Sequence, residues 1–422
     1  MNSEHYADLA DILARLIEAA SRINEAKQQR YWYPLAMATY GVEEIIEAVD
    51  SLCNFRTTMW EKTRAFEQAF AEYQGCADAV MVNSGSSADL LLAFLLTNPY
   101  QPRVSPDTEI LLPVVTWPTQ IWSPMMAGLQ VRLVDVDPNT LNISLDDLER
   151  KITPHTRAIF LVHLLGNPCD MEHILALAED HDLLILEDCC EAMGSTWDGV
   201  KVGNFGIGGT YSFFFAHHMM TMEGGMISCP DEATANQLRV LRAHGWLRNV
   251  DPGTYDLSGY DVDPRYAFVN WGFNVRPTEL QAGFGLHQLK KVPTFTQRRE
   301  HLAAQFFAFM DTTPWLTRPE VHPLARPSWF ALPVMVHRDA TFSRADLTAY
   351  LEAEGVETRP IVTGNVTRHP VAELFPETFA GDFPGGDAVH TQGFYLGLSP
   401  MQADGDMDRL LTCFAAFLQR YE

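Results

Sequence analysis

Short apolar runs alternate with amphipathic stretches through the middle of the chain. From about residue 76 onwards, runs of five or six apolar residues are followed by segments with the 3.6-residue period of helices. Such runs, separated by helices, are typical of a mostly parallel sheet that is covered on both faces. The expected strands are 77–82, 109–115, 131–136, 157–165, 182–186 and 210–215, with helices at 86–96 and 171–180.

The two ends of the chain are more helical than its middle. The expected helices are 1–26, 43–52, 60–73, 277–289, 300–310, 344–354 and 406–420, with one further strand at 329–337. The change of pattern after the middle region predicts a second, smaller unit. We therefore expect an N-terminal helical segment (1–60), a large α/β domain (61–295) and a small C-terminal α+β domain (296–422).

The composition changes what kind of ligand can be expected. Apolar residues make up 47% and charged residues 20% of the 422 residues, which suits a folded enzyme with a large buried core. The net charge of −24, from 30 Lys+Arg against 54 Asp+Glu, argues against a surface for nucleic acid. A phosphate-bearing ligand must therefore be held by local features of the protein.

Location and metal binding are also constrained by the sequence. There is no apolar run of about 18 residues that could span a bilayer, and the acidic start has no basic segment typical of a secretion signal. The seven cysteines are scattered, which indicates reduced thiols in a cytoplasmic protein. No cysteine or histidine spacing matches a metal site, so we expect no metal.

One junction between a strand and a helix has the residues of an anion site. Gly85 and Ser86 lie in the run Asn83–Ser87, where a strand is expected to turn into a helix. Glycine allows the backbone to approach a ligand, and the free N–H groups at a helix start favour phosphate. An ordinary helix N-cap explains the same residues equally well.

Other polar and aromatic residues follow expected strands. Asp188 comes after the buried run 183–186, and ligands of open α/β sheets bind at that edge. Trp117 ends another strand, where it could stack on a flat ligand or belong to the core. Glu191 lies in the same loop as Asp188 with a less clear role. For Asp188 itself, the alternative is a strand-ending aspartate in a turn.

His217 is the most informative residue of the chain. It lies five residues after Ser212 and six before Glu223, in the segment Ser-Phe-Phe-Phe-Ala-His-His-Met-Met-Thr-Met-Glu-Gly-Gly. Imidazole can accept and return protons near neutral pH. Taken alone, two adjacent histidines could simply end a buried strand.

The order of these features resembles the fold-type I sugar aminotransferases that depend on pyridoxal phosphate (PLP). Their pattern Ser-Phe-x-x-x-Lys-x-x-x-x-x-Glu-Gly-Gly has its Schiff-base lysine where this chain has His217. This exchange is the mark of the family's branch of 3-dehydratases, such as those acting on GDP-4-keto-6-deoxymannose. The resemblance extends over residues 33–36, 81–87, 116–119, 163–168, 272–276 and 358–365.

The resemblance implies a role for each matching residue. Gly85, Ser86 and Ser212 would hold the cofactor phosphate, Trp117 would stack on its ring, Asp188 would pair with its pyridine nitrogen and His217 would be the base. Glu191 departs from the Gln or His that the family often has at this position near the ring hydroxyl. Asn274 would reach the phosphate of the neighbouring subunit in a homodimer, and the nucleotide-sugar side would be formed by Arg359, Asn365 and Arg368.

The implied reaction is removal of the C3 hydroxyl of a nucleotide-linked 4-keto-6-deoxysugar with pyridoxamine phosphate (PMP). One branch of such enzymes uses an iron–sulfur cluster and a reductase, but residues 244–274 contain no cysteine, so we expect no cluster. The other branch releases ammonia and regenerates PMP with glutamate, and we favour it although the segment 247–270 is longer than expected. An aminotransferase, or a pseudoenzyme that binds PLP for regulation, are the alternatives.

Overall fold

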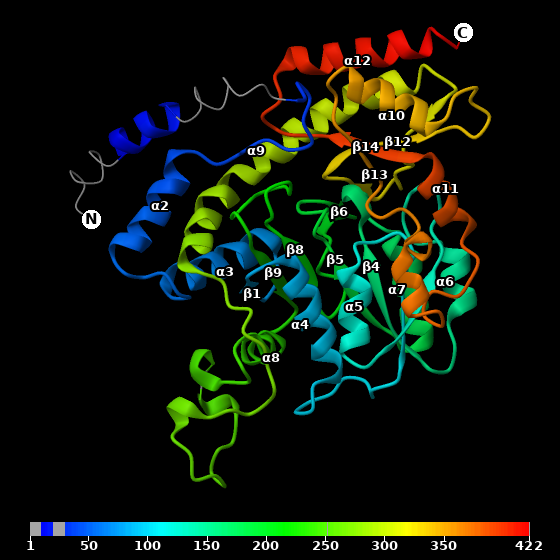
Figure 1. Ribbon diagram of the computed structural model, residues 1–422. Helices are drawn as coiled ribbons and strands as arrows, with labels where there is room; N and C mark the ends of the chain where they lie inside the picture. The colour runs from blue at the N-terminus through cyan, green and yellow to red at the C-terminus, as the bar shows by residue number, and fades with distance from the viewer. Residues whose placement is uncertain (1–9, 20–29, 251, 422) are drawn as a thin grey trace.

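A seven-stranded sheet forms the centre of the computed structural model, which describes residues 10–19, 30–250 and 252–421 (Figure 1). The strand order is β1-β9-β8-β5-β4-β2-β3. Strands β3, β2, β4, β5 and β8 are parallel, and β9 is antiparallel to both β8 and β1. The strands are β1 (Asp78–Val82), β2 (Glu109–Pro113), β3 (Gln130–Val134), β4 (Thr156–Val162), β5 (Leu184–Asp188), β8 (Gly209–Ser212) and β9 (Gly225–Cys229).

Helices cover both faces of this sheet because successive strand residues point to opposite sides. Val80 and Val82 pack with one set of helices, whereas Ala79 and Met81 pack with another. The fold expected from the apolar runs is therefore confirmed. The first set is α4 (Gly85–Thr97), α5 (Thr119–Met126) and α8 (Glu232–Arg242); the opposite face carries α3 (Glu61–Gln74), α6 (Leu145–Lys151), α7 (Met171–His181) and the start of α9.

A second core lies in the C-terminal part of the chain. Its antiparallel sheet has the order β10-β12-β14-β13 and packs against α10, α12 and the second half of α9. Tyr33 joins this core and bridges to Val356, so the segment near residue 33 belongs to it spatially. The elements are β10 (Leu316–Thr317), β12 (Ala331–Val336), β13 (Thr358–Pro360), β14 (Gly393–Gly397), α10 (Arg344–Ala353), α11 (Pro384–Gln392) and α12 (Asp404–Leu418).

One long helix, α9 (Glu279–Met310), links the two cores, where two separate helices at 277–289 and 300–310 were expected. Thr278 caps its start, and Pro293 lies within it without ending it. The first half contributes Ala282 and Leu289 to the large core, and the second half contributes Leu302 to the small core. Each half of the helix is buried in a different core, which explains why the helix continues through Pro293. The predicted domain boundary near residue 295 falls inside this helix rather than in a linker.

Other differences from expectation concern short elements. Helices α5, α6 and α11 have eight, seven and nine residues, too few for a clear period, and were not expected; helix α8 and strand β9 were also not expected. Residues 10–19 are helical, and the remainder of the expected helix 1–26 lies outside the described residues. None of the described helices is long and apolar enough to cross a membrane. The remaining elements are α2 (Val42–Cys53) and the small sheet of β6 (Thr196–Trp197), β7 (Val200–Lys201) and β11 (Ala325–Arg326).

Residues 247–250 and 252–270 form an appendage that extends from the body beyond α8 (Figure 1). It contains the short 3-10 turns η2 (Leu247–Asn249), η3 (Pro252–Thr254) and η4 (Pro264–Tyr266). Trp246 stacks on Tyr266 and Phe268, with ring centroids 5.4 and 6.0 Å apart. Leu247 and Tyr255 are buried in a small cluster that includes Val240 of α8, and the Tyr255 ring centroid lies 4.8 Å from that of Tyr100. The appendage is therefore anchored to the body at its base.

Candidate active site

Most of the residues singled out from the sequence line one cavity of about 580 Å³. It lies where β4, β5 and β8 end at their carboxyl edge and where α4 begins. A larger groove of about 820 Å³ lies elsewhere and contains none of these residues. The predicted site residues in the cavity are Gly85, Ser86, Trp117, Asp188, Glu191, Ser212, His217 and Arg359.

One end of the cavity has the geometry of an anion site. Ser84 caps α4 by accepting a hydrogen bond from the Ser87 N–H, so Gly85 and Ser86 form its first turn. A Cβ on Gly85 would lie 2.6 Å from the Ser212 Cβ, so only glycine allows β8 to approach this closely. Unpaired N–H groups at a helix start attract a phosphate. Both readings of this motif, N-cap and anion site, are thus compatible with the structure.

Asp188 ends β5 on the cavity floor. It is 5% exposed, and its Oδ1 accepts a hydrogen bond from the Cys190 N–H at 2.9 Å. Burial raises the pKa of Asp188, because a carboxylate is poorly solvated there, and the contacts to Cys190 and the charge of His163 offset this only in part. A cation placed above this carboxylate would remove that penalty. The position therefore suits a protonated ring nitrogen.

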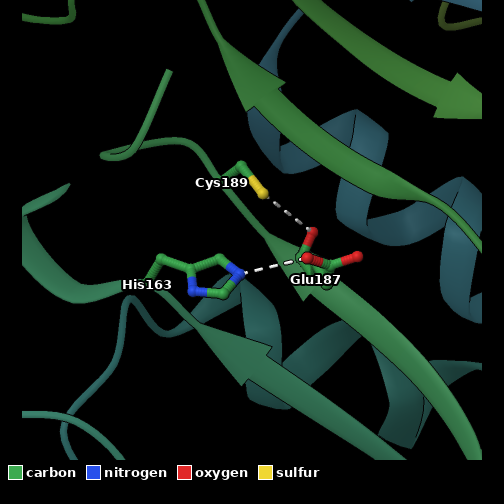
Figure 2. Close-up of side chains that lie close together, drawn as sticks. All are labelled: His163, Glu187 and Cys189. Atoms are coloured by element: carbon green, nitrogen blue, oxygen red, sulfur yellow. Dashed lines mark hydrogen bonds and ion pairs between the residues drawn. The ribbon is translucent and has the colours of Figure 1, made fainter. Parts of the chain in front are cut away.

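A buried cluster next to Asp188 fixes the end of β5 (Figure 2). The His163 Nε2–H donates to Glu187 Oε2 at 3.2 Å, and its Nδ1 accepts from the Cys169 N–H at 3.0 Å. Glu187 also accepts backbone hydrogen bonds from residues 203, 205 and 206. Burial raises the pKa of Cys189 to about 12, which disfavours a thiolate. The His163 and Glu187 side chains are already engaged in hydrogen bonds within the protein. The cluster therefore stabilises the end of β5, and we do not interpret it as a metal site.

His217 faces the cavity with one ring nitrogen already engaged. Its Nδ1–H donates to the Cys190 carbonyl oxygen at 2.7 Å, which leaves Nε2 as the nitrogen with a lone pair. The ring packs against Phe330, with centroids 5.2 Å apart. Burial lowers the pKa of His217 to about 4. The imidazole is therefore neutral at pH 7 and held as a base.

Comparison with known proteins identifies the family to which this arrangement belongs. Residues 39–415 match the model of the DegT/DnrJ/EryC1/StrS aminotransferase family. The chain belongs to this family. The resemblance inferred from the sequence is thereby confirmed.

Its relatives in this family include sugar dehydratases. The chain is 37% identical over 369 residues to GDP-4-keto-6-deoxy-D-mannose 3-dehydratase of Yersinia pseudotuberculosis, covering 86% of this chain and 93% of the relative. It is 33% identical to dTDP-4-dehydro-2,6-dideoxy-D-glucose 3-dehydratase of Saccharopolyspora spinosa, with 91% and 86% covered. A structure of GDP-4-keto-6-deoxymannose-3-dehydratase with a trapped PLP–glutamate geminal diamine has a TM-score of 0.84 and 33% identity, covering 90% and 99%.

Glu191 lies in the wall of the cavity. Its Oε2 accepts the Leu165 N–H at 2.9 Å. Burial, with a contribution from the charge of Asp188, raises the pKa of Glu191 to about 7. The carboxyl group is thus protonated in a substantial fraction of molecules at neutral pH. It can then donate a hydrogen bond, as Gln can.

Trp117 and Arg359 lie toward the open side of the cavity. The Trp117 side chain is 59% exposed, so its face is free to stack on a ring. Arg359 Nη2 donates to Glu357 Oε1 at 2.8 Å and keeps about half of its side chain exposed. Both residues are accessible to a ligand that enters from this side.

Three predicted residues are not brought to the cavity. Asn274 is exposed and forms an isolated bridge with Ala243. Asn365 is 2% exposed, and its Nδ2 donates to Asp387 at 2.6 Å. Arg368 is also paired with Asp387. The last two residues are therefore paired with Asp387 and do not line this cavity, and their contact with a nucleotide sugar stays a prediction.

Sequence reasoning missed several residues of the cavity. Asp89 lies near Asp188, Thr119 lies 3.4 Å from Ser86 (Oγ1 to Oγ), and Phe330 and Tyr395 come from the small domain. Asp89 was detectable as a charged residue within the otherwise apolar helix 88–96. The two aromatic residues gave no sequence signal, because buried aromatic side chains are common in any core.

Proposed function

We propose that this protein is a PMP-dependent sugar 3-dehydratase. It removes the C3 hydroxyl of a nucleotide-linked 4-keto-6-deoxysugar in deoxysugar biosynthesis, and glutamate regenerates PMP. The observation that carries the proposal is the orientation of His217, whose Nδ1–H is bound by the Cys190 carbonyl while Nε2 stays available in the cavity. The family's aminotransferases need a lysine at this position, and the chain has none there.

The residues present fit PLP and PMP. The first turn of α4 with Ser212 suits the phosphate, the exposed face of Trp117 suits the ring, and buried Asp188 suits the protonated pyridine nitrogen. When bound, PMP supplies an amine that condenses with the C4 ketone and a ring that accepts electrons. An imidazole at residue 217 cannot form a covalent bond to PLP as lysine does. The cofactor would be held by non-covalent contacts alone.

His217 would carry the proton transfer. Nε2 accepts a proton, and the resulting imidazolium can return it to the departing C3 hydroxyl. The low pKa of the buried ring favours this return, because the charged form is poorly solvated. Asp188 would hold the proton of the pyridine nitrogen and stabilise the charge that develops during elimination.

The substrate side of the cavity has little positive charge of its own. Of the residues lining it, Arg359 is the one guanidinium, against the carboxyl groups of Asp89, Asp188, Glu191 and Glu223. A sugar nucleotide carries a diphosphate that needs further donors. We infer that Arg359 binds the nucleotide-sugar and that a GDP-linked sugar is the first substrate to test, on the basis of the relatives' names. A role for Asn365 and Arg368 would require exchange of their Asp387 contacts.

A homodimer would supply these donors from a second chain. The groove of about 820 Å³ contains six arginines, including Arg248 and Arg276, in a chain whose net charge is −24. Arg276 lies two residues after Asn274, which is exposed outside the chain's own cavity. We infer that this face approaches the phosphate groups bound by the partner subunit. The free thiols of all seven cysteines support the further proposal of a cytoplasmic location.

A substrate screen tests the proposed function. Purified protein with PMP and glutamate is supplied in parallel with GDP-, CDP- and dTDP-linked 4-keto-6-deoxysugars. A dehydratase yields the 3-deoxy-4-ketosugar, ammonia and 2-oxoglutarate, whereas an aminotransferase yields a 4-amino sugar and a pseudoenzyme yields neither. Turnover is expected without iron or a reductase. Stoichiometric iron in anaerobically purified protein, or a strict need for a reductase, would overturn this assignment.

A further inference from the structure

Two buried carboxyl groups lie together under the cavity. Asp89 on α4 and Asp188 at the end of β5 have carboxyl oxygens that lie within 4.8 Å of each other and of the Cys190 Sγ. Asp89 is 2% exposed and Asp188 is 5% exposed. The Thr210 hydroxyl donates to Asp89 Oδ1 at 2.7 Å, while the Cys190 N–H donates to Asp188. Both side chains line the cavity in which the cofactor is proposed to bind.

The surroundings supply too little positive charge to balance two carboxylates. Among the described residues, the groups that face this pair are Thr210 from β8, Cys190 and Glu191 from the loop after β5, and His163, whose charge lowers the pKa of Asp188 in part. Burial raises the pKa of the Cys190 thiol, so it stays neutral. His163 already donates its Nε2–H to Glu187. Two ionised carboxylates in this environment would repel each other strongly.

We propose that Asp89 and Asp188 share one proton, with Asp89 as the carboxylic acid, so that Asp89 is a positioning residue for the charge beneath the cofactor ring. A single negative charge then faces the single positive charge of a protonated pyridine nitrogen. Burial and the charge of Asp188 raise the pKa of Asp89 well above its usual value, and the Thr210 hydrogen bond offsets this only in part. The inference rests on the proposed function for the position of the cofactor, but the proton itself belongs to the protein alone.

The first test uses the cofactor-free protein and the variant Asp89→Asn. Asparagine keeps the shape and the oxygen that accepts from Thr210, but it cannot ionise. A carboxyl group with a raised pKa makes the folded state less stable as pH rises above about 4, where the unfolded group loses its proton. We compare the midpoint of thermal unfolding of D89N with that of the wild type at each pH. The difference, D89N minus wild type, should be more positive at pH 8 than at pH 5 by about 2 °C or more. The infrared band of a buried carboxylic acid that persists at pH 8, where Glu191 is mostly ionised, should disappear in D89N.

Cofactor binding gives a second measurement. Because Asp89 is already neutral, D89N should bind PMP within about threefold of the wild type at pH 6.5, as an uncharged isostere does. The control is Asp135→Asn, a buried aspartate outside this cavity that accepts the N–H groups of Gly385 and Gly386. D135N should show neither the stability gain at higher pH nor the loss of the infrared band.

Thr210→Val keeps the test decisive if D89N does not fold. Removing the hydroxyl favours the protonated form of Asp89, so the stability of T210V should fall at least as steeply as that of the wild type as pH rises from 5 to 8. A D89N curve parallel to that of the wild type, or a shallower fall in T210V than in the wild type, would overturn the shared proton. A loss of PMP affinity of more than about tenfold in D89N at pH 6.5 would show instead that Asp89 acts as an anion. Since the stability curves need no substrate, they are independent of the screen for dehydratase activity.

Discussion

The His217 Nδ1 lies 2.7 Å from the carbonyl oxygen of Cys190, a residue that precedes it by 27 positions in the chain. This contact fixes the tautomer of the ring, because a carbonyl oxygen can only accept a hydrogen bond. Nε2 is thereby left as the basic nitrogen. Asp188 ends β5, and the loop that follows it orients His217 through Cys190, which joins the two central parts of the proposed site.

Replacing His217 by lysine should change the cofactor from non-covalently bound to covalently bound. A lysine amine can bond covalently to PLP, whereas the imidazole base is lost, so we expect dehydration to fall at least about 100-fold. Borohydride treatment should then fix PLP to the protein, as measured by mass spectrometry. The control is His218→Gln, since His218 is buried and directs Nε2 to the Ser328 carbonyl. Surviving dehydration in H217K, or no trapped cofactor, would mean that residue 217 does not face the cofactor.

The pH profile should reflect the low pKa of His217. Burial lowers this pKa to about 4, so the free base persists down to that pH. The ordinary pKa of a histidine side chain is about 6.5. We expect that kcat/KM does not fall near this pH, because His217 is still unprotonated there. The unfolded chain binds more protons than the folded one between pH 4 and 6.5, so this group's contribution to stability is lost as pH falls through that window. An acidic limb near pH 6.5 that vanishes in H217N would contradict the prediction.

Glu191→Gln should preserve function near neutral pH. The pKa of Glu191 is raised to about 7 by burial, and glutamine keeps an oxygen that can accept the Leu165 N–H. We expect activity at pH 6.5 within about threefold of the wild type, since glutamine mimics the protonated acid. The absorbance of bound cofactor should titrate near pH 7 in the wild type and lose this step in E191Q. Identical titrations in both proteins would show that Glu191 does not sense the cofactor.

Mixing two inactive variants should restore activity if sites are shared between subunits. In H217N the base is lost, and in N274A the proposed contact to the partner's phosphate is lost. Random exchange of subunits gives half heterodimers, each with one intact site, so about one quarter of wild-type activity should return. The control is a mixture of H217N with H217K, which cannot form an intact site. Full activity of a monomer in sedimentation analysis would exclude the arrangement.

Local sequence order determined a large part of this protein. The spacing from Ser212 and Glu223 placed His217 in register with the family, because residues in one short segment keep their relative positions on folding. The apolar runs likewise determined a mostly parallel sheet, whose covered strands must be apolar on both sides. Asp188 could be assigned to the cavity for the same reason, since it follows a strand whose carboxyl end points to the ligand edge.

Only the tertiary structure decided how these residues act. The hydrogen bond that selects Nε2 of His217 comes from a backbone carbonyl, which has no side-chain signature in the sequence. The neighbour of Asp188 is Asp89, which belongs to another element and meets it only when α4 packs on the sheet. The continuity of α9 through Pro293 likewise depends on two cores that the helix joins. Protonation and orientation follow from burial and from contacts between distant segments, and folding alone brings these together.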